Sequence, residues 1–252
     1  MSKPDISANR TTAPDKGAAE NLNADYAALG QATAKLVHDF KNQLGGLKLY
    51  ATFLKTRLTQ DAESAEIVTK IVEGIDAMAE NATLVSRFAR PLELRCEWGD
   101  LAALVHKVVA ALTPQGAARQ VVLLAECADE VPQLRFDWQQ MHFALEAVVR
   151  RALAVALPQS KVRVGLQLRD KPGDQTVTLW VGEDSERLSE QARLIFFDWT
   201  AQERLQKTAL EMAHAARIVQ AHGGAAKVRQ AGNLTLVEFI FKSELPPQEQ
   251  HA

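Results

Sequence analysis

The chain has 252 residues, of which 47% are hydrophobic and 24% charged, and its formal net charge is −2. This ordinary composition lacks the basic excess of most proteins that bind nucleic acids or membrane surfaces. No run approaches the ~20 apolar residues of a membrane span, and the N-terminus lacks the apolar core of a signal peptide. The two cysteines have no paired spacing and are expected to be reduced thiols. We therefore expect a cytoplasmic protein of one large or two small domains, without a nucleic-acid or membrane partner.

The two ends of the chain are expected to be disordered. Residues 1–23 are rich in Ser, Thr, Ala, Asn, Pro and Lys and poor in large apolar side chains. Such a segment buries too little surface to offset the entropy lost on ordering, so it is predicted to be a disordered leader. Residues 245–252 are polar and are expected to form a loose tail.

A long helix is predicted from about Asp25 to Leu58. Its apolar residues recur at alternating steps of three and four, which is the 3.5-residue period of a coiled coil or helical bundle. This seam consists of Val37, Phe40, Leu44, Leu47, Ala51, Leu54 and Leu58. Gly45 and Gly46 interrupt the pattern. They either let a partner's backbone approach closely or permit a bend, or they serve only local packing between helices.

A second helix with the same steps is predicted from about Ala65 to Ala89, after a short polar break. Pro91 ends it, because the residue before a proline avoids the helical region. Two long helices with a short connection form an antiparallel hairpin, here spanning residues 24–91. An isolated hairpin leaves much of its apolar stripe in water. We therefore expect two copies to pair as a four-helix bundle in a symmetric homodimer.

His38 is the candidate reactive residue of the hairpin. It lies one residue past a seam position, so it is expected to face water while Val37 and Phe40 face the bundle. Asn42 lies one turn further on the same face, and Asp39 is adjacent. A lone exposed histidine on a helix is usually only a solvated residue. An imidazole held between an acid and an amide can also accept and pass on a phosphoryl group.

From Leu92 to about residue 244 the pattern changes to mixed helices and strands. Three helices are predicted: one capped by Asp100, one over residues 138–157 and one over residues 203–221. The predicted strands, several with alternating apolar residues, are at 121–124, 161–168, 177–181, 226–229 and 234–241. This order predicts an α+β sandwich of one sheet with helices on one face. His106, His142, His214 and His222 lack metal-ligand spacing and are interpreted as structural or surface residues.

The segment from His38 to Leu44 resembles the phosphoacceptor box of two-component histidine kinases, whose usual form is His-(Asp/Glu)-x-x-(Asn/Thr)-x-Leu. The resemblance implies that His38 accepts the phosphoryl group and that Asp39 orients the ring and accepts its other proton. It implies that Asn42 contacts the phosphoryl group or a water. Lys41 would offset phosphate charge, although a solvated surface lysine is the simpler interpretation.

The second domain resembles the ATP-binding domain of the same kinases, a fold shared with gyrase and the Hsp90 chaperone. The landmarks are Asp137 before a long helix, the strands within 161–181, and a final helix ending in Ile218-Val219-Gln220-Ala221-His222-Gly223-Gly224. The family pattern for that ending is Ile-Val-x-x-His-Gly-Gly. The resemblance therefore implies a phosphoacceptor hairpin followed by an ATPase-type domain, in the family's order.

Three motifs of the ATP site depart from the family's pattern. The family's magnesium-binding Asn in the long helix is Arg151 here, and an arginine has no acceptor atom for a metal. The family's Asp-x-Gly-x-Gly is replaced by the run from Glu183 to Arg187, which keeps a carboxylate but neither glycine. The last glycine-rich loop aligns with residues 207–212, where no glycine remains and Glu211 adds negative charge.

Arg151 and Lys207 either offset phosphate charge in place of magnesium, or the pocket is filled by side chains and the domain is a docking surface. We expect the second, with no cofactor and no metal in this chain. The leading hypothesis is a histidine phosphotransferase that exchanges phosphoryl groups with the Asp of response-regulator receivers, which bring their own Mg²⁺. The alternatives are a divergent kinase that still autophosphorylates and a dimeric docking scaffold without chemistry.

Overall fold

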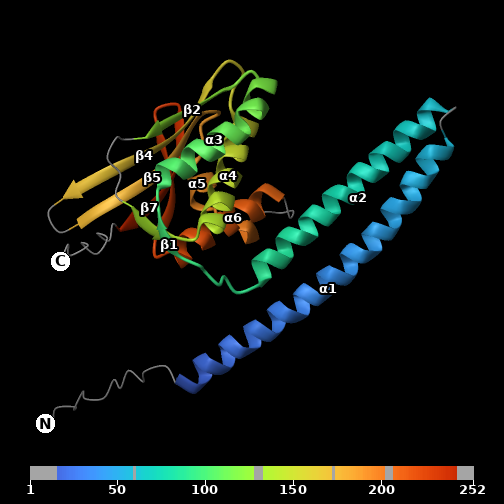
Figure 1. The fold of residues 1–252 in the computed structure, drawn as a ribbon, viewed down its shortest axis with the longest axis horizontal. Coiled ribbons are helices and arrows are strands. Elements are labelled where there is room, and N and C mark those ends of the chain that lie inside the picture. Colours follow the sequence, from blue (N-terminus) through green and yellow to red (C-terminus); the bar gives the residue numbers. More distant parts are fainter. Residues whose placement is uncertain (1–15, 59–60, 128–132, 172–173, 202–206, 243–252) are drawn as a thin grey trace, which may run out of the picture. The chain divides into compact units, whose positions relative to one another are not determined.

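The computed structural model describes residues 16–58, 61–127, 133–171, 174–201 and 207–242. The chain divides into two compact units between Pro91 and Leu92 (Figure 1). The first fifteen residues of the expected leader and all of the expected tail lie outside the described residues. Within the described part, no helix combines the length and the apolar character that crossing a membrane would require.

The first unit is a hairpin of two long helices, α1 (Lys16–Arg57) and α2 (Ala62–Ala89). The first helix begins before the expected start near Asp25, so the leader expected over residues 1–23 is helical from Lys16 onward. The physical reason is that extending an existing helix adds one hydrogen bond per residue, whereas nucleating a new one is costly. Asp61 caps α2, because its carboxylate accepts a hydrogen bond from the Ser64 N–H at 3.2 Å.

Alternate members of the α1 seam are buried inside the hairpin. Val37, Leu44 and Ala51 are only 4–8% exposed, and the last two pack with Val68 and Ile75 of α2. These α1 residues are seven apart, as one side of a heptad stripe should be. The contact between the two helices therefore uses one half of the seam.

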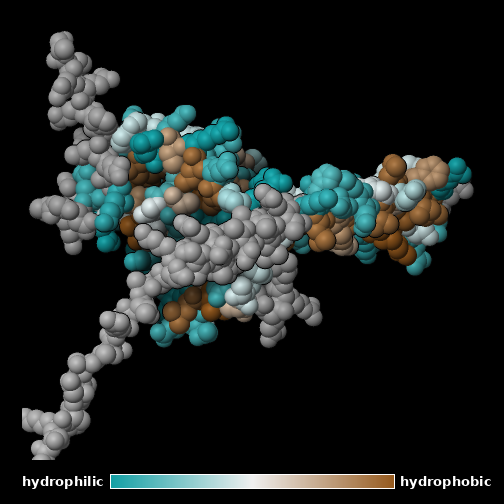
Figure 2. Space-filling view, turned by 90° about the horizontal axis from the view of Figure 1, so that it is seen from below, coloured by the Kyte–Doolittle hydropathy of each residue, from teal (hydrophilic) through white to brown (hydrophobic). Residues whose placement is uncertain are grey.

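The other half of the seam faces water in the single chain. Phe40, Leu47 and Leu54 of α1 are 43–55% exposed, and Ile71 and Met78 of α2 are 48–49% exposed. Figure 2 shows hydrophobic side chains on the surface of the hairpin, on the arm at the right of the view. The seam pattern assigns these residues to a bundle interior. They are exposed here because contact between two helices buries only one half of the seam. In a bundle, further helices would bury the other half.

The second unit is an α/β sandwich built on a five-stranded sheet of order β2-β4-β5-β7-β6. β2 and β4 are parallel, and the other neighbours are antiparallel. A separate pair, β1 and β3, is antiparallel. The elements are β1 (Glu97–Gly99), α3 (Leu101–Ala118), β2 (Val122–Cys127), β3 (Leu134–Phe136), α4 (Trp138–Val155), β4 (Lys161–Lys171), β5 (Asp174–Asp184), α5 (Glu190–Leu194), a 3₁₀ turn (Trp199–Ala201), α6 (Lys207–Ala221), β6 (Ala225–Ala231) and β7 (Leu234–Lys242).

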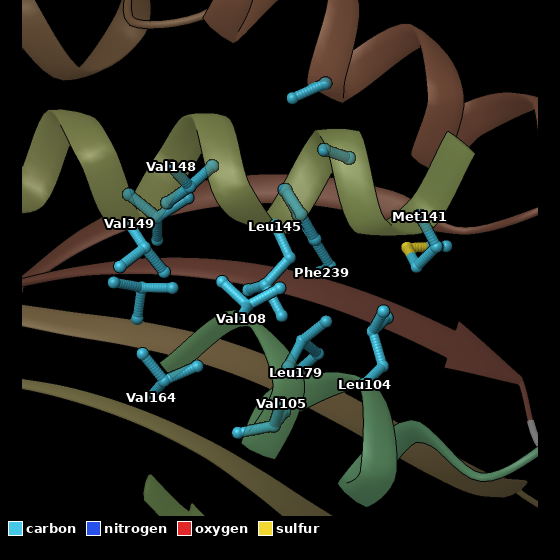
Figure 3. Packing of buried hydrophobic residues seen from close by; sticks show 14 of the residues in the cluster. Leu104, Val105, Val108, Met141, Leu145, Val148, Val149, Val164, Leu179 and Phe239 are labelled. Carbon is cyan, nitrogen blue, oxygen red and sulfur yellow. The ribbon is translucent and has the colours of Figure 1, made fainter. Parts of the chain in front are cut away.

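The core of this unit lies between the sheet and α3, α4 and α6. Figure 3 shows apolar side chains of α3 and α4 meeting those of β4, β5 and β7. Every second residue of the central strands is buried, which is why their sequences alternate. Val164, Leu179 and Phe239, one from each of three strands, are at most 2% exposed. The predicted sandwich is confirmed; β1, β3, α5 and the 3₁₀ turn are too short to produce a periodic pattern.

The His-Gly-Gly ending joins the last helix to the start of α4. His222 accepts a hydrogen bond at Nε2 from the Asp137 N–H at 2.9 Å, and its Nδ1 lies 2.8 Å from the Ile218 carbonyl oxygen. The two contacts together require the proton on Nδ1. Gly223 has a φ of 72°, the left-handed conformation that ends a helix. A Cβ on Gly224 would lie 2.7 Å from the Phe241 ring.

Replacing His222 with alanine should leave the Asp137 N–H without its acceptor. We expect this to lower the free energy of unfolding by about 1–3 kcal/mol. Urea unfolding followed by tryptophan fluorescence measures it, because all four tryptophans lie after Pro91. His106→Ala is the matched control, since His106 is exposed on α3. Equal losses in the two variants would show that the hydrogen bond contributes nothing.

Candidate functional site

His38 is presented on the outer side of the hairpin. Its side chain is 73% exposed, while Val37 beside it is buried against α2. The ring Nδ1 lies 3.4 Å from the Asp39 carboxylate and 3.4 Å from the Asn42 side-chain nitrogen. The three residues that the sequence singles out therefore gather within one turn of one helix.

The two neighbours of His38 compete for the same ring nitrogen. Both distances are longer than the usual ~2.7–3.2 Å of a hydrogen bond, so neither contact locks the ring. A protonated Nδ1 donates to Asp39 and leaves the lone pair on Nε2. An unprotonated Nδ1 accepts from Asn42 and places the proton on Nε2. Only the Asp39-paired tautomer has a free lone pair on Nε2, and two equal distances do not decide between the tautomers.

A hollow of about 250 Å³ opens beside His38. One side of it comes from α1, through Val37, His38 and Lys41. The other side comes from the last turns of α2, whose lining residues are Thr83, Ser86, Arg87 and Arg90. These α2 residues are not among the candidates that the sequence offers. Counting equal distances from the hairpin turn pairs His38 with Asn81, so it would have pointed near Thr83 but not to Arg87 or Arg90.

In the second unit, two of the altered positions bind each other. Arg151 of α4 donates to Glu183 of β5 at 2.5 Å, and their side chains are 12% and 2% exposed. The guanidinium carbon of Arg151 also lies 4.5 Å from the centre of the Phe196 ring. The position that the resemblance aligns with the family's magnesium ligand is therefore paired with the position that it aligns with the adenine ligand.

The charge state of Glu183 reflects this setting. Burial raises the pKa of the Glu183 carboxyl above its usual range, and the Arg151 guanidinium and Ser185 hydroxyl act against that rise. The carboxylate is therefore costly to bury, and Arg151 is the cation that offsets the cost. Removing either partner would leave the other charge buried alone.

The other two altered positions are also close to each other. Lys207 Nζ and Glu211 Oε1 lie 4.0 Å apart, one turn apart in α6. Lys207 is half exposed, and Glu211 is 19% exposed. The added carboxylate that the sequence places near the expected phosphates therefore has a cation beside it. Among the described residues, no group of three or more His, Cys, Asp or Glu side chains is arranged to hold a metal ion.

Comparison with known proteins finds relatives among sensor proteins. No protein-family model matches the chain. It is 26% identical over 204 residues to the alginate biosynthesis sensor protein KinB of Pseudomonas aeruginosa, and 21% identical over 198 residues to the sensor histidine kinase ZraS of Klebsiella oxytoca. The chain is related to the two-component histidine kinases. The matches cover 76% and 78% of the chain but only 33% and 42% of these relatives, so it spans less than half of their length.

Solved histidine kinases share the fold. Full-length ShkA in complex with AMPPNP superposes with a TM-score of 0.68 at 22% identity, over 86% of this chain and 47% of ShkA. The histidine kinase AdeS of Acinetobacter baumannii superposes with a TM-score of 0.51 at 13% identity, over 77% of this chain and 94% of AdeS. At such identities the likeness concerns the fold. The individual site residues have to be judged by their own chemistry.

Arg151→Ala should destabilise the second unit, because Glu183 would be left charged and buried. We expect the free energy of unfolding to fall by about 3–5 kcal/mol. A double variant, Arg151→Met with Glu183→Leu, should lose much less, because it removes both charges. Urea unfolding followed by tryptophan fluorescence measures both. The double variant returning no stability would contradict the pairing.

The Arg151→Ala loss should also depend on pH. A carboxyl whose pKa is raised in the folded state contributes stability that is fully present below its unfolded-state pKa. This contribution is lost as the pH rises through its folded-state pKa. Without Arg151 that folded pKa rises further. The difference between wild type and variant should therefore be larger at mildly alkaline than at mildly acidic pH.

Proposed function

We propose that the chain is a histidine phosphotransferase of a bacterial phosphorelay, in which His38 exchanges phosphoryl groups with the Asp of response-regulator receivers. The observation that carries the proposal is the buried contact between Arg151 and Glu183. An arginine cannot ligate magnesium, and this one also covers the carboxylate that would bind adenine. The residues present do not fit the magnesium–ATP complex as the family binds it. Phosphate on His38 would then have to come from another protein.

The exposed imidazole suits such an exchange. In the Asp39-paired tautomer, the Nε2 lone pair attacks phosphorus of a receiver's aspartyl phosphate. An N–P bond forms, the P–O bond breaks, and the carboxylate leaves with its electron pair. The proton stays on Nδ1, where Asp39 lies 3.4 Å away and stabilises the resulting imidazolium. By the family resemblance, Asn42 would contact the phosphoryl oxygens or a water; its side-chain nitrogen lies 3.4 Å from Nδ1, so it would have to turn toward the Nε2 side. The receiver supplies its own Mg²⁺ for this step.

We also propose that the active form is a homodimer through the hairpin. The exposed half of the seam, Phe40, Leu47, Leu54, Ile71 and Met78, is a stripe that a second copy of the hairpin would match. Pairing two such stripes makes a four-helix bundle and removes their apolar surface from water. His38 lies off this stripe, so dimerisation would leave it open to a receiver.

A second candidate is a divergent kinase that still autophosphorylates. The similarity to the sensor histidine kinase ZraS, and to the solved structure of ShkA with AMPPNP, favours it. Lys207 would then have to offset phosphate charge despite its proximity to Glu211. A dimeric docking scaffold without chemistry is the third interpretation, and it requires nothing of His38.

Mixing the purified chain with a receiver carrying labelled phosphate should produce acid-labile, base-stable label on the chain. His38→Ala should abolish that label, because the nucleophile is removed. His106→Ala, an exposed histidine of the other unit, should keep it. Label on His38→Ala, or none on the wild type with cognate receivers, would contradict the transferase.

Incubation with γ-labelled ATP and Mg²⁺ separates the two catalytic candidates. The transferase remains unlabelled when no receiver is present, and a divergent kinase labels itself at His38. A scaffold gives no label in either experiment.

The dimer is tested by a charge placed on the stripe. Leu47→Lys should convert the dimer to monomer, since burying an unpaired ammonium costs more than the contact gains. Leu49→Lys is the matched control, because Leu49 is 69% exposed and off the seam. Light scattering after gel filtration measures the mass, and a monomeric wild type would end the proposal.

A further inference from the structure

The hollow beside His38 carries an unusual share of positive charge. Besides His38, three of its seven lining residues carry a positive charge, and none of the seven is acidic. Lys41 comes from α1, while Arg87 and Arg90 come from the last turn and the C-cap of α2. All three side chains are exposed. The charge balance of this hollow suits an anion that approaches His38.

Arg87 and Arg90 also have a simpler role. Cations at the end of a helix offset the partial negative charge of its free carbonyl groups. That role explains basic residues at the end of α2, but it does not require them to share a hollow with His38. It does not apply to Lys41, which lies in the middle of α1 and whose simpler interpretation is a solvated surface lysine.

One neutral residue of the hollow can serve the same ligand. It is not Thr83, whose hydroxyl proton is already donated to the Ala79 carbonyl oxygen at 2.8 Å. The Ser86 hydroxyl lies on the same wall and can donate to an oxygen anion. A volume of about 250 Å³ is ample, since one water takes about 30 Å³ of liquid.

We propose that this hollow is a phosphate-binding site that receives the phosphoryl group of His38. The guanidinium groups of Arg87 and Arg90 present planar forks that match phosphate oxygens, and Lys41 adds a point charge. The site neutralises the phosphoryl dianion as Nε2 attacks and holds it once the N–P bond has formed. The proposal deepens the proposed transferase and rests on it for its biological role.

The site can be tested without any partner protein by using phosphoramidate. The Nε2 lone pair attacks phosphorus, the P–N bond of the reagent breaks, and ammonia leaves with the electron pair. The intact mass of the full chain follows the labelling, and His38→Ala identifies the labelled residue. Arg87→Ala with Arg90→Ala should slow the labelling about tenfold, because two charge-assisted contacts are lost.

Two further variants separate a specific site from general charge. Lys55→Ala with Lys70→Ala removes the same charge from the hairpin away from the hollow, and it should label at the wild-type rate. Arg87→Lys with Arg90→Lys keeps the charge but not the forks, and it should label at an intermediate rate. Circular dichroism checks that each variant keeps its helices.

Competition by inorganic phosphate gives an independent readout. At constant ionic strength, phosphate should slow the labelling of the wild type but not that of the Arg87→Ala, Arg90→Ala variant. The site would be overturned if the Arg87→Ala, Arg90→Ala variant and the Lys55→Ala, Lys70→Ala control were labelled at equal rates and phosphate did not compete. If the variants behave as expected but no receiver phosphorylates the chain, the phosphate site stands and the proposed relay is disproved.

Discussion

The 3.5-residue seam of α1 is the constraint on which the hairpin and its chemistry depend. Burial of Val37 and Leu44 against α2 fixes the rotation of the helix, and this rotation turns His38 outward. The same packing brings the end of α2 alongside, so that Arg87 and Arg90 line the hollow at the imidazole. The core that stabilises the hairpin therefore also sets the surroundings of the His38 ring.

The second unit keeps the kinase fold while its altered positions pair with each other. Arg151 and Glu183 come from α4 and β5, and their charges offset one another in a setting where either alone would be costly. Phe196 lies against the guanidinium. The His222 contacts with Asp137 and Ile218 preserve the frame of the sandwich independently of these changes. Changes at these positions and retention of the fold are compatible, because different residues are responsible for each.

Much of the architecture could be predicted because it follows from periodicity. The steps of three and four predicted both helices of the hairpin, and the alternation in β4 and β5 predicted central strands of the sheet. The exposed position of His38 follows from the same counting. The short elements β1, β3 and α5 were missed, since three to five residues give no period. The early start of α1 at Lys16 does not follow from composition, because a polar segment predicts disorder whereas extending an existing helix costs little free energy.

The sequence by itself determined which side chains are chemically able to act: an imidazole flanked by Asp39 and Asn42, and an arginine where a metal ligand would be needed. Only the tertiary structure decided what these groups meet. It paired Arg151 with Glu183 across helix and strand, and it brought the α2 cations to His38 from the other arm of the hairpin. The reason is that periodicity fixes the face a residue occupies, whereas contacts between elements depend on how the faces pack.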